Sequence, residues 1–406
     1  MPKQEIVCGL DAGSNQITCA VGRQDSSRGV IEVLAGARLF SRGMQGGVVV
    51  NIGECVDVTK RAIEECEDKI DELVHSVRLG IRGSFVETIT SRGVASHSRS
   101  DKEINDEDIE DVIDNARATV QVSSEKEIID IVPQEYTLDR QKGIPNPIGM
   151  EGNYLEVSVL IVTAIKSHLT NLAKAVRQAG FAVAQPVYGI LAAGDVVVRD
   201  EERESGCLLI DFGGQTTGLA VYADRSIKLT KEIPFGSDII TRDVSHAFRT
   251  SLQQAREIKE KYGALFPKGI EHQEVDYTSI DGRTVKKTDV GALSKIIRPR
   301  FEELFERIKD EIEKSYCADI IVPGGAIITG GGALLDGCEK ACSEILEVET
   351  RIGAPIGCKG PQEIVANPGY ATAIGLLKYN TGFESFGRRN IIHKMSLWRK
   401  VRELFS

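Results

Sequence analysis

The stretch IVCGLDAGSNQITCAV, residues 6–21, predicts a buried β-strand, a glycine turn that begins at Asp11, and a second strand that returns beside the first. The stretch CLLIDFGGQTTGLAVY, residues 207–222, repeats this plan, with Asp211 at the start of its turn. A third glycine-rich site, AIITGGG at residues 326–332, predicts a strand, a tight turn and then a helix. The second half of the chain therefore repeats the organisation of the first.

These three sites are suited to binding phosphate and nucleoside groups. Because glycine has no Cβ, consecutive backbone N–H groups can approach an anion closely and surround it. Ser14 and Thr216 add hydroxyl donors. Asp11 and Asp211 stand where they can hold Mg²⁺ through water, because Mg²⁺ gives up its water ligands reluctantly. Two such turns facing each other would hold a triphosphate from both sides, and the triplet Gly330–Gly332 would lie close to adenine or ribose.

One Asp-x-Gly turn alone is also a common β-turn with no ligand. The prediction therefore depends on two matched turns and a glycine triplet that occur in this order. The sequence contains neither the G-x-x-x-x-G-K-[ST] pattern of a P-loop nor the G-x-G-x-x-G pattern of a dinucleotide-binding fold.

Composition restricts the class of protein. The chain has 406 residues, of which 41% are hydrophobic and 27% are charged, as expected for a soluble protein of several subdomains. Its net charge of −10 argues against nucleic acid as the main partner, because phosphate backbones are bound by basic faces. No apolar run approaches the roughly 18–20 residues of a membrane-spanning helix, and no signal peptide is recognisable. Nine scattered cysteines predict reduced, mostly buried thiols, so a cytoplasmic location is expected.

Residues 83–166 predict a compact α+β unit inserted into the first half of the chain. Asn105, followed by Asp108 three residues later, is typical of a capped helix N-terminus. Stretches rich in β-forming residues follow at 128–132 and 157–165, separated by a loop that contains several glycines and prolines.

The C-terminal tail differs in charge from the rest of the chain. Residues 382–406 carry a net charge of +4, which leaves −14 on the remainder. After a polar linker at 381–390, residues 391–406 predict a basic amphipathic helix suited to the surface of an anionic membrane. The alternative is a C-terminal helix docked on the body of the protein. The residues expected to contact lipid are Leu397, Trp398, Arg399, Lys400, Val401, Arg402, Leu404 and Phe405.

Several stretches resemble the FtsA family of bacterial cell-division proteins, within the actin/Hsp70/sugar-kinase superfamily, over nearly the whole chain. They are SRGM (41–44), VPQEY (132–136), NPIG (146–149), TGG (329–331), RIGAP (351–355) and ATAIGLL (371–377). The resemblance implies an α/β fold: an actin-like, two-lobed ATPase with a duplicated ribonuclease H-like core and an α+β subdomain inserted in the first lobe. The implied subdomains are 1A (1–82 and 167–196), 1C (83–166), 2A (197–235 and 326–380) and 2B (236–325).

The same resemblance implies that ATP and Mg²⁺ bind between the lobes. The residues that match the two phosphate motifs, the adenosine motif and a helix bordering adenosine are Asp11, Gly13, Ser14, Asn15, Asp211, Gly213, Gly214, Gln215, Thr216, Thr217, Lys259, Gly330, Gly331 and Gly332. Gln215 departs from the family, which often has a third glycine there, and this bears on hydrolysis more than on binding. Because no residue that positions the attacking water can be assigned, we expect at most weak ATPase activity.

The function implied is that of a cell-division scaffold. Such a protein polymerises on the cytoplasmic face of the inner membrane at mid-cell, anchors FtsZ filaments and helps recruit later division proteins. The C-terminal peptide of FtsZ would contact subdomain 2B, where four basic residues are suited to carboxylates: Arg283, Lys295, Arg298 and Arg300. Arg300 is the best match to the family, and a solvated charged face is the alternative interpretation. The inserted subdomain is the candidate contact for polymerisation and for later proteins.

Three other functions share parts of this pattern. A pilus-assembly actin homologue would not need the basic tail. A small-molecule kinase would need a catalytic carboxylate in a substrate pocket, and an Hsp70-like chaperone would need a separate peptide-binding domain.

Overall fold

The first half of the chain is built around a six-stranded sheet. The computed structural model describes residues 6–25, 30–96 and 103–379, so the predicted linker and C-terminal helix lie outside the described residues. In spatial order the strands are β11 (Ala182–Tyr188), β6 (Ser76–Ile81), β1 (Ile6–Ala12), β2 (Gln16–Asp25), β3 (Val30–Phe40) and β19 (Cys358–Lys359). β1 runs antiparallel to β2 and parallel to β6, and the turn from β1 to β2 is the first predicted glycine turn.

The second half repeats this arrangement in a five-stranded sheet. Its spatial order is β14 (Ser226–Ile233), β13 (Thr217–Ala223), β12 (Cys207–Phe212), β17 (Ala326–Thr329) and β18 (Thr350–Ile352). β12 runs antiparallel to β13 and parallel to β17, as β1 does with β2 and β6. The repeated organisation predicted from the two Asp-x-Gly stretches is thereby confirmed.

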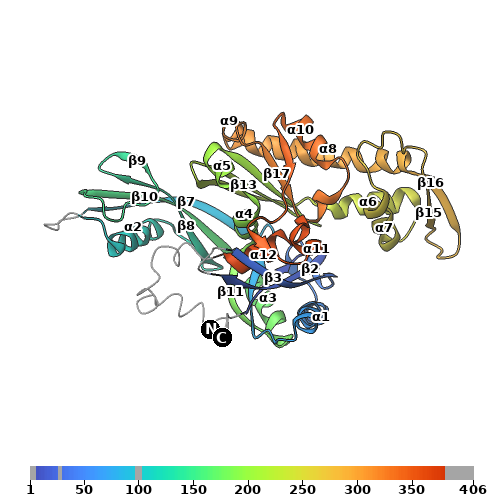
Figure 1. Ribbon diagram of the computed structural model, residues 1–406, viewed down its shortest axis with the longest axis horizontal. Coiled ribbons are helices and arrows are strands. Elements are labelled where there is room, and N and C mark those ends of the chain that lie inside the picture. Colours follow the sequence, from blue (N-terminus) through green and yellow to red (C-terminus); the bar gives the residue numbers. More distant parts are fainter. Residues whose placement is uncertain (1–5, 26–29, 97–102, 380–406) are drawn as a thin grey trace.

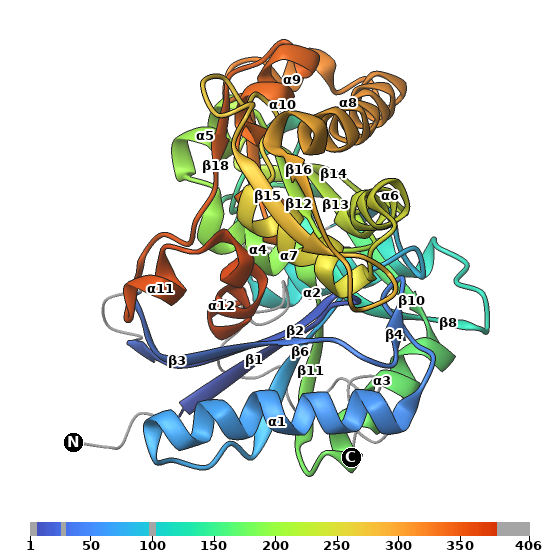
Figure 2. The same cartoon turned by 90° about the vertical axis from the view of Figure 1, so that its right-hand side faces the viewer.

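Helices cover both faces of the first sheet (Figure 2). α1 (Ile52–Ile70) and α3 (Lys166–Gln178) lie on the outer face, whereas α12 (Ala371–Lys378) lies on the inner face, toward the second half. α12 also packs on α4 (Gly189–Val197), the helix through which the chain passes from the first half to the second.

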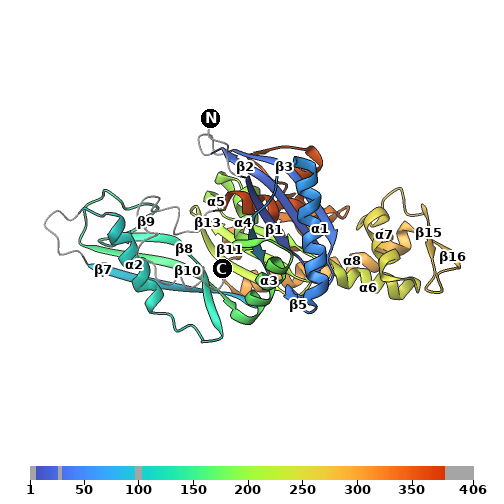
Figure 3. The ribbon, with the colours of Figure 1, turned by 90° about the horizontal axis from the view of Figure 1, so that it is seen from below.

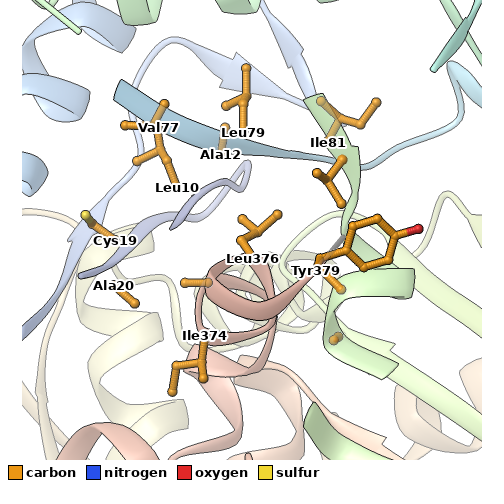
Figure 4. Close-up of a cluster of buried hydrophobic side chains, with 14 of the residues drawn as sticks. Leu10, Ala12, Cys19, Ala20, Val77, Leu79, Ile81, Ile374, Leu376 and Tyr379 are labelled. Carbon is orange, nitrogen blue, oxygen red and sulfur yellow. The ribbon is translucent and has the colours of Figure 1, made fainter. Parts of the chain in front are cut away.

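Close contact of α12 with the first sheet depends on small residues. A Cβ at Gly9 would lie 2.2 Å from the carbonyl oxygen of Ala373, so the helix rests directly on the backbone of β1. Figure 4 shows Leu376 of this helix directed toward Leu10 and Leu79. Each of these leucines is at most 1% exposed, and such burial stabilises the fold by roughly 1.5–3 kcal/mol per side chain. A segment from the end of the second half therefore helps to form the core of the first.

The inserted unit is an antiparallel sheet with one helix. The strand order is β7 (Val86–Ser96), β10 (Tyr154–Ile165), β8 (Lys126–Leu138) and β9 (Gln141–Ile144), and α2 (Asp106–Ala118) packs on one face. The predicted helix start is confirmed, because Asn105 Oδ1 accepts the N–H of Asp108 at 3.2 Å while Asp108 Oδ2 accepts the N–H of Asn105 at 3.0 Å. Figure 1 shows this unit projecting from one end of the molecule.

The opposite end is mostly helical. Figures 1 and 3 place a two-stranded hairpin there, at the far end of the long axis from the insert. Its elements are α6 (Ser237–Phe248), α7 (Leu252–Tyr262), β15 (Glu274–Thr278), β16 (Val285–Asp289) and the 25-residue α8 (Val290–Lys314).

Short elements complete the fold. They are β4 (Met44–Gln45), β5 (Val48–Val49), α5 (Asp200–Ser205), α9 (Ala318–Ile321), α10 (Cys338–Leu346), α11 (Gln362–Val365) and the 3₁₀ segments 331–334 and 368–370. Within the described ranges, no helix is both long enough and apolar enough to cross a membrane. The nine cysteines all lie in these ranges and are free thiols, as predicted, and only Cys358 is not fully buried.

Candidate functional site

The first glycine turn, between β1 and β2, is held by the short hairpin β4–β5. The Ser14 hydroxyl accepts a hydrogen bond from the N–H of Gly47 at 2.8 Å, and the carbonyl of Asn15 accepts the N–H of Ser41 at 2.9 Å. Gly47 has φ of +83°, and a Cβ there would lie 2.1 Å from the carbonyl oxygen of Arg82. Only glycine fits this position without displacing the backbone, so the hairpin packs directly on the backbone that follows β6.

The second glycine turn, between β12 and β13, is fixed by the first residues of α6. The carbonyls of Gly213 and Gly214 accept hydrogen bonds from the N–H groups of Ser237 at 3.0 Å and Asp238 at 2.7 Å. The Gln215 carboxamide, which replaces the expected glycine, also has protein partners. Its Oε1 accepts the N–H of Gly46 at 2.8 Å, and its Nε2 donates to Asp238 Oδ2 at 3.1 Å. Gln215 therefore connects the first half of the chain to the second.

The third glycine site begins at Gly330. This residue has φ of +84°, and a Cβ there would lie 2.4 Å from Asp211 Oδ1. The triplet enters a short 3₁₀ helix, and the following α-helix, α10, begins only at Cys338. A Cβ at Gly332 would lie 2.4 Å from Phe212 Cδ1, so this backbone passes very close to β12.

Lys259 reaches the same region from α7. Its Nζ is buried and donates to Thr241 Oγ1 at 2.9 Å and to the Ser237 carbonyl at 3.2 Å. Burial lowers the pKa of Lys259 to about 8, because the ammonium group loses its hydration. The ammonium group of Lys259 thus lies near the glycine sites, although its burial costs free energy.

The structure brings the three sites together around one cleft between the two halves. A Cβ at Gly214 would lie 2.4 Å from the Cβ of Asn15, so the two turns are in contact. The cleft has a volume of about 230 Å³. Every residue predicted to contact nucleotide lines it except Thr217, whose hydroxyl donates to the Phe235 carbonyl at 2.7 Å. Nucleotide binding by these residues itself stays a prediction.

Some polar atoms of the cleft have no protein partner. Asp11 Oδ1 and Asn15 Oδ1 are buried and make no hydrogen bond within the described part of the chain. Because buried polar atoms are normally paired, such atoms in a concave site are available to a ligand.

Arg82 is a residue of this site that the sequence analysis missed. It follows β6 directly, and its Nη2 donates to Asp11 Oδ2 at 3.0 Å, to Asp211 Oδ2 at 2.9 Å and to Thr372 Oγ1 at 3.0 Å. An arginine at the end of a buried apolar strand was the available signal, since arginine is almost never buried unless it is paired. Arg38, Pro368 and Gly369 also line the cleft and were not predicted to do so.

Carboxylates around Arg82 have perturbed acidities. Burial raises the pKa of Asp11 to about 6, with a further increase from the Asp211 charge, while Arg82 opposes the shift. Burial likewise raises the pKa of Glu232 to about 7, although this carboxylate accepts the N–H of Gly83 at 3.2 Å. The region thus concentrates negative charge in a poorly hydrated place, where Arg82 compensates most of it and Arg38 adds a smaller contribution at Asp11.

The predicted peptide-binding residues lie on or near α8. Lys295 and Arg298 line a surface groove, in which the Arg298 guanidinium lies 4.7 Å from the centre of the Phe266 ring. Arg300 is directed to other partners: its Nε lies 2.5 Å from Asp243 Oδ2, and its Nη1 lies 2.6 Å from Glu303 Oε2. Arg283 lies in the exposed turn between β15 and β16. The structure therefore brings only two of the four predicted residues into the groove.

The predicted membrane-binding residues, 397–405, lie outside the described residues. Their role stays a prediction.

Comparisons with known proteins identify the family. The family model described as "Cell division protein FtsA" matches residues 208–375, and the model described as "SHS2 domain inserted in FTSA" matches residues 83–163. The FtsA of Pseudomonas aeruginosa is 34% identical over 94% of this chain and 91% of its own length. The FtsA of Escherichia coli K12 is 30% identical over 93% of this chain and 90% of its own length.

Solved structures with the same fold are more distant in sequence. A chain of the PilM–PilN type IV pilus biogenesis complex aligns with a TM-score of 0.66 and 18% identity, over 92% of this chain and 98% of that one. MreB5 of Spiroplasma citri bound to ADP aligns with a TM-score of 0.56 and 14% identity, over 92% and 95% of the two chains. These likenesses show the fold alone, and they confirm the predicted actin-like α/β architecture. With the curated relatives and both family models in agreement, the chain belongs to the FtsA family of cell-division proteins.

Proposed function

We propose that this chain binds ATP in the cleft between its halves and acts as a scaffold for cell division. In this proposal it polymerises at the cytoplasmic face of the cell membrane at mid-cell, attaches FtsZ filaments to that membrane and helps recruit later division proteins. The observation that carries the proposal is the meeting of two Asp-x-Gly turns and a glycine triplet around one cleft. MreB5, which shares the fold, has been solved with ADP and with AMPPNP, and this supports a nucleotide as the ligand.

The residues of the cleft fit a nucleoside triphosphate. Gly13 and Gly214 let the two turns fold tightly, because a Cβ would lie 2.5 Å from the Gln16 carbonyl oxygen at Gly13 and 2.4 Å from the Asn15 Cβ at Gly214. The backbone of both turns lines the cleft, where N–H groups can bind phosphate oxygens. Lys259 supplies a positive charge, and Gly331 and Gly332, which line the cleft without side chains, can lie against a base or a ribose. When bound, ATP supplies a chain of phosphates long enough to contact both halves, so binding would hold the halves in one relative position. This is a physical basis for assembly that depends on nucleotide.

A glycine substitution tests ATP binding directly. Gly330→Ala places a methyl group 2.4 Å from Asp211 Oδ1 at a φ of +84°, so the triplet must move. We expect ATP affinity, measured by displacement of a fluorescent ATP analogue, to fall by more than about tenfold. Gly282→Ala is the matched control, because Gly282 has φ of +69° but nothing within 4 Å of its Cβ position. Equal affinity in both variants and the wild type would contradict ATP binding at this cleft.

The groove beside α8 is our proposed site for the FtsZ peptide. Arg298 and Lys340 lie 4.7 and 4.3 Å from the centre of the half-buried Phe266 ring, and Lys295 also lines the groove, so the groove combines positive charge with an apolar floor. An acidic peptide with apolar anchors matches this chemistry. Arg300 would act through its ion pair with Asp243, which connects α8 to α6, and through its pair with Glu303 one turn further along α8.

Membrane attachment is proposed for residues 391–406, on the strength of their sequence. Deletion of this segment should abolish co-sedimentation with vesicles that contain anionic lipid. The variant Arg399→Gln, Lys400→Gln, Arg402→Gln keeps the apolar stripe and should weaken binding to anionic vesicles by roughly 100-fold, since each basic residue near such a surface contributes about 1 kcal/mol. Unchanged sedimentation of the deletion variant would refute the anchor.

A further inference from the structure

Arg82 lies at the point where the two glycine turns meet. One of its nitrogens, Nη2, donates to an oxygen of Asp11 from the first turn and to an oxygen of Asp211 from the second, at 3.0 and 2.9 Å. The side chain is only 13% exposed, and a hydroxyl of α12, Thr372 Oγ1, accepts from the same nitrogen at 3.0 Å. A single buried guanidinium therefore links both halves of the repeated fold at the centre of the cleft.

This arrangement does not fit a Mg²⁺ ion bound directly by the two aspartates. Mg²⁺ requires a near-octahedral set of oxygens at about 2.0–2.1 Å. Here each aspartate already has one carboxylate oxygen on Arg82, and Asp211 Oδ2 also accepts the Thr372 hydroxyl at 3.2 Å. Among the described residues there is no group of three His, Cys, Asp or Glu side chains able to hold a metal ion. One oxygen of each carboxylate that was predicted to hold Mg²⁺ through water is therefore bonded to a cation of the protein.

Arg82 also has an N–H donor without a partner in the described part of the chain. Its Nε is buried and has no hydrogen-bond partner within the described residues. Its Nη1 lies beside the second glycine turn, 3.1 Å from the place that a Cβ on Gly213 would occupy, and Arg82 lines the cleft. A guanidinium that lines the cleft beside a glycine turn and has an unpaired N–H is suited to a phosphate oxygen.

The charges around Arg82 show why such a cation is needed. Burial of Arg82 lowers its pKa, but three carboxylates raise it above the ordinary value: those of Asp11 and Asp211, which are buried, and that of Glu232, which is half-buried. A triphosphate that approached these carboxylates without a compensating positive charge would be strongly repelled. Arginine stays protonated at any pH that the fold survives, so the compensation is permanent.

We propose that Arg82 is the fixed cation of the nucleotide site, binding the phosphate chain of a nucleoside triphosphate where a metal ion held by the protein would otherwise be required. The inference rests on the proposed binding of ATP. It implies that ATP binds with similar affinity whether or not Mg²⁺ is present, because Mg²⁺ is carried by the phosphates and not by Asp11 or Asp211. It also assigns to the two aspartates the role of holding Arg82 in place.

The test is the dependence of ATP affinity on Mg²⁺, measured by displacement of a fluorescent ATP analogue in millimolar Mg²⁺ and in EDTA. For the full-length wild type we expect the two dissociation constants to agree within about threefold. For Arg82→Gln, affinity in EDTA should fall by about 30-fold or more, the effect of losing a charged hydrogen bond, whereas Mg²⁺ should restore most of it. Arg82→Lys should stay nearly independent of Mg²⁺ but bind more weakly, because lysine supplies the charge without the planar donor set.

Arg38→Gln is the matched control. Arg38 lines the same cleft but donates to Gln16 and not to either aspartate, so its loss should weaken binding equally with and without Mg²⁺. Circular dichroism checks that each variant folds, and the wild-type comparison is decisive even if Arg82→Gln does not. Wild-type affinity that falls more than about tenfold in EDTA overturns this inference alone. Absence of ATP binding in both conditions overturns the proposed function and this inference with it.

Discussion

Replacing Lys259 by methionine tests whether a buried cation in the cleft is kept at a cost to stability. Burial lowers the pKa of Lys259 from 10.5 to about 8. In the folded protein the amine therefore binds its proton less tightly than in the unfolded chain. Below pH 8 the charged amine therefore destabilises the folded state by its full amount. This destabilisation decreases as the pH rises from 8 toward 10.5.

The expected change in the free energy of unfolding follows from the difference between these two pKa values. The difference between 10.5 and about 8 corresponds to roughly 3 kcal/mol of destabilisation at pH 7 and to under about 1 kcal/mol at pH 10. Methionine also removes a hydrogen bond to Thr241, which contributes about 1 kcal/mol. The carbonyl of Ser237 keeps a donor, because the Thr241 hydroxyl lies 3.3 Å from it. We therefore expect Lys259→Met to be more stable than the wild type by about 2 kcal/mol at pH 7 and nearly equal to it at pH 10.

Urea unfolding followed by far-ultraviolet circular dichroism, at pH 7 and pH 10, measures this difference. The matched control is Lys261→Met on the same helix, where the side chain is exposed and a change within about 0.5 kcal/mol is expected at both pH values. The more stable variant should bind ATP about tenfold more weakly, because the cleft has lost a cation. A variant that is less stable at pH 7, or that gains equally at both pH values, would refute the reasoning.

Three further predictions concern the contact between the two halves, the groove beside α8 and the rate of ATP hydrolysis. Gln215→Gly removes the hydrogen bonds from this side chain to Gly46 and Asp238, so the two halves should separate more easily. The dissociation rate of a fluorescent ATP analogue, measured by stopped flow, should then rise several-fold. An unchanged rate would show that Gln215 does not hold the two halves together. Arg298→Glu should weaken binding of an acidic FtsZ C-terminal peptide by more than about tenfold, measured by fluorescence anisotropy. Arg283→Glu, outside the groove, should change the affinity little. Equal losses in both variants would argue for a general charge effect. Steady-state phosphate release should be slow, and turnover of several per second would contradict a weak ATPase.

Local sequence was enough to predict the parts of the fold that depend on neighbouring residues. The turns at Asp11 and Asp211 follow from apolar strands that end in glycine, and the helix start at Asn105 follows from its spacing to Asp108. The inserted α+β unit was recognisable because its helix and strands show their own periodicities. These signals lie within a few residues of one another, so no knowledge of distant contacts was needed.

Contacts between distant residues could not be predicted in the same way. Arg82 meets Asp11 because Gly80 of β6 pairs with Asp11 of β1 in parallel, and the sequence does not state which strands are neighbours. Arg82 then meets Asp211, 129 residues away, only because the two halves face each other. Likewise, the charge pattern around α8 did not reveal that Arg300 is paired with Asp243 from another helix.

The most direct test of a nucleotide-dependent membrane scaffold uses the emission of Trp398, the only tryptophan of the chain. Full-length protein is titrated with vesicles of anionic or neutral lipid, with and without Mg-ATP. We expect a blue shift on anionic vesicles that grows with ATP, because assembly presents many tails to the same surface, and little or no shift on neutral vesicles. Emission that is already blue without lipid and does not change would show that the tail is docked on the body of the protein, which would contradict a membrane anchor.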